Sequence, residues 1–164
     1  MFAGNMTDVF AHQYTLVASA RGVLLDYCAG LVPAHFAAPV AAMNDGSIRD
    51  LLVHVAGCYD YWLGQVGLGR PAGTPPPEAV TDVAALRAVF AGVDALVAAF
   101  GRHYAADWLV PKLFVLPRRA QPLELTPLQL FTHTVTHEFH HKGQVLSMSR
   151  LLGYAPVDTD IIRT

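Results

Sequence analysis

The sequence contains little that would direct the protein to a nucleic acid, a membrane or an oxidising compartment. Its 13 acidic and 11 basic residues give a formal net charge of −2, which provides no electrostatic attraction to nucleic acid or to an anionic membrane. Apolar runs are broken by Asp, Arg or Gly well short of the ~20 residues that span a bilayer, and the N-terminus lacks a signal-peptide pattern. We therefore expect a soluble, cytoplasmic protein that binds neither nucleic acid nor membrane.

Cysteine is also scarce. Cys28 and Cys58 are too few for a disulfide framework, which is typical of a reducing compartment. Free cysteine is commonly a small buried hydrophobe, so we interpret Cys58 as a core residue rather than as a nucleophile or a metal ligand. A length of 164 residues predicts one domain, over 1–164, with a single core.

Histidine, by contrast, is concentrated in one segment. Four of the eight histidines, at 133, 137, 140 and 141, lie within nine residues. At about 100° per residue, His133, His137, His141 and Gln144 share one narrow helical stripe, with apolar residues above and below. The stripe predicts a polar patch that faces the core and needs partners there. We interpret His140, at the edge of the stripe, as structural.

Capping signals and apolar periodicity predict an all-α fold, a four-helix bundle with long crossover connections. Thr126, Pro127 and Gln129 predict a helix start with a capping box, and Ser47 and Asp50 predict a second one. The connection over 102–125 is long, so we expect it to pack over an end of the bundle, partly extended, as a lid. The predicted helices span about 6–30, 47–67, 81–100 and 127–152.

The histidine spacing predicts half of a metal site, because His137 and His141 are spaced i, i+4 and can share one ion. We expect the third ligand to be His54, on the inward face of the helix over 47–67, whereas Val53 lies away from that face. Three histidines leave coordination positions open for water or substrate. Imidazole suits zinc, nickel and iron, and zinc is our first expectation.

Other residues near this trio are candidates for supporting roles. His133, one turn before His137, is either a further ligand or a residue that supports the ligands and lines a pocket. Tyr61, Trp62 and Gln144 also lie near the ligand stripe and are candidates to line a pocket, although aromatic residues at helical spacing are more often core.

The segment 137–141 also matches the H-E-x-x-H pattern, in which a glutamate, here Glu138, serves as the general base of a zinc peptidase. Metzincins continue to a glycine and a third histidine, but Gln144 and Ser147 stand there. A thermolysin-like site needs a downstream glutamate, and none follows Glu138. A peptidase is therefore the less favoured reading, and Glu138 stays a candidate for a place in the pocket.

A second apolar stripe on the last helix points nearly opposite the histidines, so this helix must be buried on both sides. Either the 102–125 connection or a second subunit covers it, and we expect a homodimer. The residues of this stripe are Leu128, Val135, Phe139 and Leu146.

The pattern resembles the DinB-like family of four-helix metal proteins. The resemblance rests on His54 followed by Trp62, on H-x-x-x-H, on His-His-Lys-Gly-Gln-Val over 140–145, and on Leu152-Gly153. It implies a bundle in which His54, His137 and His141 hold a divalent metal, with crossed connections between helices one and two and between helices three and four.

Some relatives are low-molecular-weight thiol transferases or thiol-dependent isomerases, which implies a metal-dependent enzyme that acts on a small molecule through a thiol. The alternative is a non-catalytic metal-binding protein or a dimeric sensor.

Overall fold

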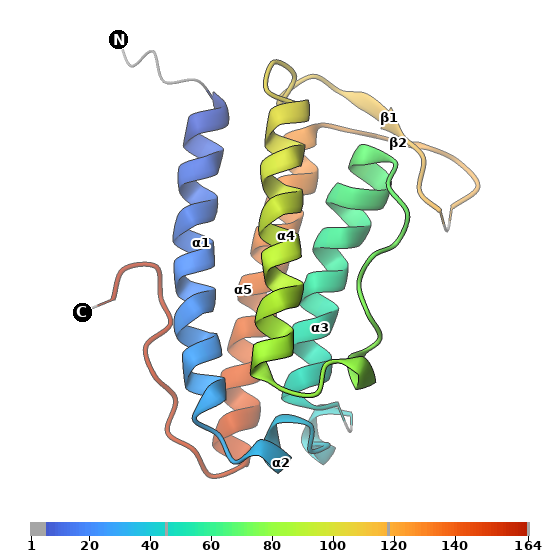
Figure 1. The fold of residues 1–164 in the computed structure, drawn as a ribbon. Coiled ribbons are helices and arrows are strands. Elements are labelled where there is room, and N and C mark those ends of the chain that lie inside the picture. Colours follow the sequence, from blue (N-terminus) through green and yellow to red (C-terminus); the bar gives the residue numbers. More distant parts are fainter. Residues whose placement is uncertain (1–5, 45, 118, 164) are drawn as a thin grey trace.

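The computed structural model describes residues 6–44, 46–117 and 119–163, and most of them are helical (Figure 1). The all-α class predicted from the sequence is confirmed. The four bundle helices are α1 (Met6–Ala29), α3 (Ile48–Tyr59) with its π-helical continuation η2 (Asp60–Gly67), α4 (Val83–His103) and α5 (Pro127–Leu151). The shorter elements are α2 (Pro33–Phe36), η1 (Ala41–Met43), η3 (Pro77–Ala79), β1 (Lys112–Phe114) and β2 (Leu123–Leu125).

The predicted caps hold the helices that carry the histidines. Ser47 and Asp50 form a capping box at the start of α3, and Thr126 and Gln129 form another at the start of α5. Each box satisfies backbone N–H groups that the first helical turn would otherwise leave unpaired. Beyond the end of α5, Gly153 takes a φ of +90°, a conformation that glycine adopts without steric cost.

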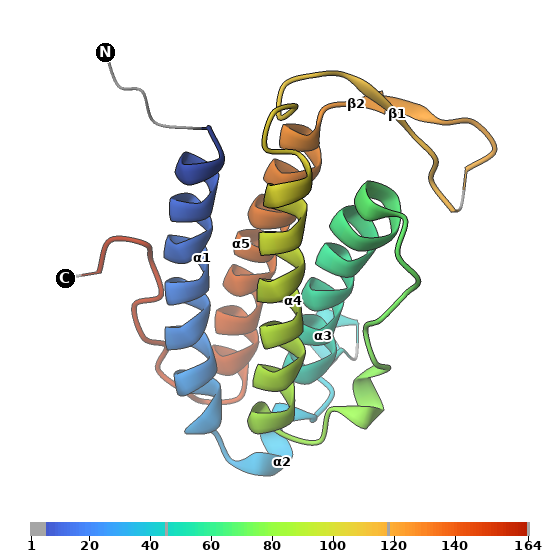
Figure 2. The same ribbon diagram turned by 45° about the horizontal axis from the view of Figure 1, so that its top comes forward.

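The directions of the bundle helices require one long connection that returns along the bundle. In two views α1 and α5 run one way, whereas α3 and α4 run the other way (Figures 1 and 2). Because α3 and α4 are parallel neighbours, segment 68–82 must return along the outside of the bundle. The bundle helices pack as α1 with α4, α4 with α3, α3 with α5 and α5 with α1 among the described residues, so α1 lies diagonally opposite α3 and α4 lies diagonally opposite α5. The connections from α1 to α3 and from α4 to α5 therefore cross opposite ends of the bundle, which agrees with the crossed connections expected between helices one and two and between helices three and four.

The 102–125 connection closes one end of the bundle through Trp108. The Trp108 ring lies 4.2 Å from the ring of Phe10 and 5.7 Å from that of Phe131, centroid to centroid. Beyond it, β1 and β2 form an antiparallel hairpin that projects past the bundle (Figure 2). The extended character expected for this connection is thus confined to three residues in each strand.

The second apolar stripe of α5 packs within the same chain. Val135 is buried, and Leu128, Phe139 and Leu146 pack against the core as partly buried side chains. This stripe therefore does not require a second subunit to cover it, and the homodimer stays a prediction.

Helix α4 is long and apolar enough to cross a membrane by length and composition alone. It lies instead in the bundle, packed against α1, α3 and η2. Leu86, Phe90 and Phe100 are buried there. This arrangement is consistent with a soluble protein, because the core helix of a soluble bundle meets the same criteria.

Candidate metal centre

Three histidine side chains meet where α3 and α5 lie side by side. His54 comes from α3, and His137 and His141 come from successive turns of α5. One nitrogen of each ring lies within 4.8 Å of the others, and Nε2 of His137 is 3.0 Å from Nε2 of His54. Because imidazole nitrogens bind zinc at about 2.0–2.1 Å, donors this close can surround one ion after small side-chain rotations. The cluster could therefore hold a metal ion.

The surroundings of His137, His141 and His133 favour the neutral form of these three rings. Burial, together with the neighbouring His141, His54 and His133, lowers the pKa of His137 to about 4. Burial also lowers the pKa values of His141 and His133. A neutral imidazole has a free lone pair, so near pH 7 these side chains offer nitrogen donors to a cation instead of repelling it.

Gln144 orients one of the three rings. Its Oε1 lies 2.6 Å from Nδ1 of His141, and because a carbonyl oxygen can only accept, Nδ1 carries the proton. The lone pair of His141 is then on Nε2. A partner on the second ring nitrogen of this kind sets the tautomer and ring direction of metal-binding histidines.

The cluster lies at the surface of the bundle, whereas the sequence predicted a patch that faces the core. His54 is exposed and His137 is half-buried, whereas His141 is only 9% exposed. Val53, predicted to lie away from the core, is buried instead. The histidines occupy the seam between α3 and α5. The core face of α5 is made by Phe131, Thr134, Val135, Glu138 and Val145, among others.

Open space lies on both sides of His54. A pocket of about 500 Å³ is lined by His54, His137, His133, Tyr61 and Trp62, together with neighbouring residues. A second pocket, of about 440 Å³, has Gln144, Met148 and His54 in its wall. The structure therefore brings the aromatic residues and His133 to the cluster, and a small molecule can approach it from either side.

The larger pocket is bordered by segment 68–82, here called the return connection, and not by the hairpin of β1 and β2. Ala72 and Thr74 line this pocket, whereas 102–125 supplies no lining residue to either pocket among the residues that the structure describes. The lid expected at 102–125 is thus not at the histidines. Asp60, which sequence reasoning missed, anchors the return connection, because its Oδ2 accepts hydrogen bonds from the backbone N–H of Gly73 (3.0 Å) and from Gln65 (3.1 Å).

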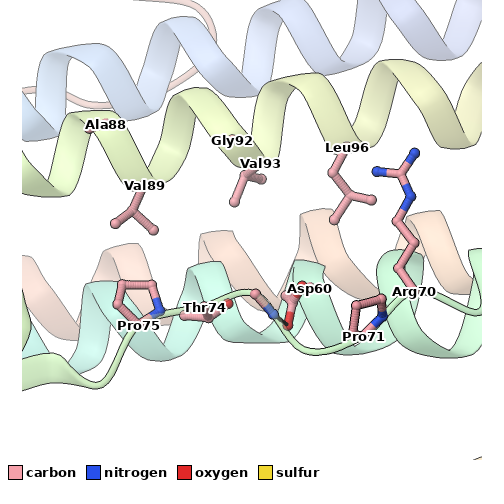
Figure 3. A pocket seen from close by; sticks show the side chains of 11 residues that line it. Asp60, Arg70, Pro71, Thr74, Pro75, Ala88, Val89, Gly92, Val93 and Leu96 are labelled. Atoms are coloured by element: carbon pink, nitrogen blue, oxygen red, sulfur yellow. Dashed lines mark hydrogen bonds between the residues drawn. The ribbon is translucent and has the colours of Figure 1, made fainter.

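A further groove of about 550 Å³ lies on the other side of the same connection (Figure 3). Pro71 and Pro75 face Val89, Val93 and Leu96 of α4 across it (Figure 3). Asp60 lines this groove and the histidine pocket alike. The return connection therefore separates an apolar groove from the histidines.

Glu138 lies away from the cluster, which corrects its expected place in the pocket. Its Oε1 accepts from Nε of Arg21 (2.8 Å), and its Oε2 accepts from the hydroxyl of Tyr59 (2.7 Å). Arg21 also donates to Asp94 and Tyr14, so a buried polar network links all four bundle helices. A zinc peptidase needs this glutamate free beside the metal. The H-E-x-x-H match is thus a coincidence of spacing.

The sequence contains a signal for this network in helix α1. Arg21 stands on the apolar stripe of α1 between Val17 and Leu24, both of which are buried. A charged residue at a core position requires a buried partner.

The comparison with known proteins agrees with the all-α fold. Among proteins with a curated function, none matches the sequence. The model of the DinB family matches residues 3–164, which is almost the entire chain. The chain therefore belongs to the DinB family.

Proposed function

We propose that this protein is a metal-dependent enzyme in which His54, His137 and His141 hold one divalent cation. The observation that carries the proposal is the meeting of three imidazole donors within 4.8 Å at a seam that pockets border on both sides. A site of three protein ligands leaves coordination positions for an outside ligand, which is the arrangement that catalytic sites share. Zinc is the first choice of metal, with nickel and iron as alternatives, because imidazole suits all three.

The surrounding residues indicate a small-molecule substrate. The larger pocket has the size of a small-molecule site, and the rings of Tyr61 and Trp62 provide apolar surface beside the exposed donors. When bound, the cation would supply Lewis-acid activation of a thiol or of water. Gln144 would hold the His141 ring so that Nε2 faces the cation, and Asp60 would hold the wall that Thr74 contributes.

The finer assignment is a transferase or isomerase that uses a low-molecular-weight thiol in the cytoplasm. Its support is the family membership together with the open sides of the site. The alternative is a metal-binding protein or dimeric sensor without catalysis, which would be favoured by a fourth protein ligand that closes the coordination shell. The exposure of His54 favours the enzyme.

The metal site is tested by zinc binding. The wild type, His54→Ala, His141→Ala and the control His12→Ala, an exposed histidine of α1, are stripped with a chelator and titrated with Zn²⁺ by calorimetry, each in a Cys58→Ser background that removes the sulfur beside His137. We expect one ion per chain in the wild type and the control, and loss of tight binding in the other two variants. Equal binding in all four proteins, or no binding in the wild type, would contradict the proposal.

The open coordination position is tested separately. The Co²⁺-loaded protein carrying Cys58→Ser, which lacks the sulfur beside His137, is titrated with 2-mercaptoethanol. We expect a new sulfur-to-cobalt charge-transfer band, because the added thiol can reach the cation. An unchanged spectrum would favour the closed, non-catalytic alternative.

A further inference from the structure

The seam between α3 and α5 carries a second group of metal donors beside the first. The sulfur of Cys58 and one ring nitrogen each of His133 and His137 lie within 4.8 Å of one another. Cys58 follows His54 by one turn on α3, and His133 precedes His137 by one turn on α5. Because these helices are antiparallel, one turn forward on α3 lies opposite one turn back on α5 (Figure 1). The geometry of the two helices therefore places a second group of three donors one helical turn away from the three-histidine cluster.

We propose that Cys58, His133 and His137 form a second cation position, which takes soft ions such as Cu⁺ and Cd²⁺. A thiolate with two imidazoles is a softer donor set than three imidazoles, and soft ions prefer sulfur. The position goes beyond the metal centre proposed above, with which it shares His137. A soft ion bound here therefore removes one ligand from that centre.

The three donors share one accessible space. Cys58, His133 and His137 all line the pocket of about 500 Å³, so an ion that enters this pocket meets all of them. His133 is held at the wall by ring contacts, with its centroid 5.0 Å from the Trp62 ring and 5.7 Å from the His137 ring. The arrangement places the sulfur deepest, since Cys58 is 8% exposed.

The three donor side chains are neutral near pH 7 in the free protein. Burial raises the pKa of the Cys58 thiol to about 12, so the side chain is neutral until a cation displaces its proton. His133 is also neutral near pH 7, because burial lowers its pKa. The binding step is then an exchange in which one metal–sulfur bond forms and the thiol proton passes to solvent.

The test disables the three-histidine site by removing two of its ligands and then probes the second donor group with Cd²⁺. The double variant His54→Ala/His141→Ala keeps Cys58, His133 and His137, and its ultraviolet spectrum is recorded during titration with Cd²⁺. We expect a sulfur-to-cadmium charge-transfer band that saturates at one ion per chain. We expect this band to be lost when Cys58→Ser is added and weakened when His133→Ala is added.

Cys28→Ser is the matched control, because Cys28 is the other buried cysteine and lies outside the group. The band should survive this change. Circular dichroism establishes that each variant is folded, and Cys58→Ala replaces Cys58→Ser if the serine variant is not. A double variant without the band, or a band that persists without Cys58, would overturn the proposal. Either result leaves the zinc test of the three-histidine site unaffected, so the two proposals fail separately.

Discussion

Arg21 and Glu138, separated by 117 positions in the sequence, form a two-pronged ion pair inside the bundle. Nε of Arg21 lies 2.8 Å from Oε1, and Nη2 lies 3.2 Å from Oε2. Arg21 is 4% exposed and Glu138 is 6% exposed, so each charge depends on the other for compensation. The pair also decides the role of Glu138, because a carboxylate held in this way is part of the interior and not of a catalytic pocket.

Replacing Glu138 by glutamine should destabilise the fold and leave zinc binding intact. Among the described residues, the change leaves Asp94 as the one charged partner of the buried Arg21, and breaking a buried pair costs about 3–5 kcal/mol. We expect the lower end of this range in urea unfolding. The control Glu124→Gln alters an exposed residue of β2 and should change stability by no more than about 0.5 kcal/mol. Glu138→Gln with wild-type stability would show that the pair does not hold the helices together.

Two glycine-to-alanine variants should shift stability in opposite directions. A Cβ on Gly67 would lie 2.6 Å from Cε2 of Phe100, which is fully buried, so this overpacked contact should cost about 1–3 kcal/mol. A Cβ on Gly143, within α5, would meet nothing within 4 Å. Alanine there should stabilise the protein by about 0.5–1 kcal/mol through the lower entropy of the unfolded chain. Urea midpoints that move the same way would contradict this reading of the packing.

Both cysteines should react slowly with iodoacetamide in the folded protein. Burial raises the pKa values of Cys28 and Cys58 from 9.0 to about 12, which lowers the thiolate fraction at pH 8 on the order of a thousandfold. Because the folded-state pKa is the higher one, this contribution to stability is complete below pH 9 and is lost as the pH rises toward about 12.

The alkylation rate should therefore keep rising with pH beyond 9 in the folded protein and level off near 9 in urea. Mass spectrometry of Cys28→Ala isolates the reaction of Cys58. A folded Cys58 that reacts as fast as free cysteine would rule out the raised pKa.

Removing the Lys142 amine should loosen the C-terminal segment without unfolding the bundle. Nζ of Lys142 donates a hydrogen bond to the carbonyl oxygen of Thr159 (2.6 Å) and lies 4.2 Å from the centre of the Phe139 ring. Lys142→Met keeps the apolar stem but loses the donor, so residues 154–163 should be cleaved faster by chymotrypsin. Arg150→Met, at an exposed position of α5, is the control. Equal cleavage in both variants would show that Lys142 does not anchor the segment.

The sequence by itself determined the parts of this protein that depend on neighbouring residues. Capping boxes at Ser47 and Thr126 defined the starts of two helices, because the side chain and the backbone groups it satisfies are within one turn. The i, i+4 spacing placed His137 and His141 on one side of α5 for the same local reason. Helical content, and with it the all-α class, followed from such signals.

Only the tertiary structure decided which face of each helix is the core. Periodicity specifies angles between residues on one helix, but a helix that is apolar on several sides leaves the inward direction open. The exposure of His54 and the burial of Val53 both depend on how α3 is rotated against its neighbours. The path of the 68–82 connection and the pairing of Arg21 with Glu138 likewise depend on helices that are distant in sequence and adjacent in space, a relationship that no local pattern encodes.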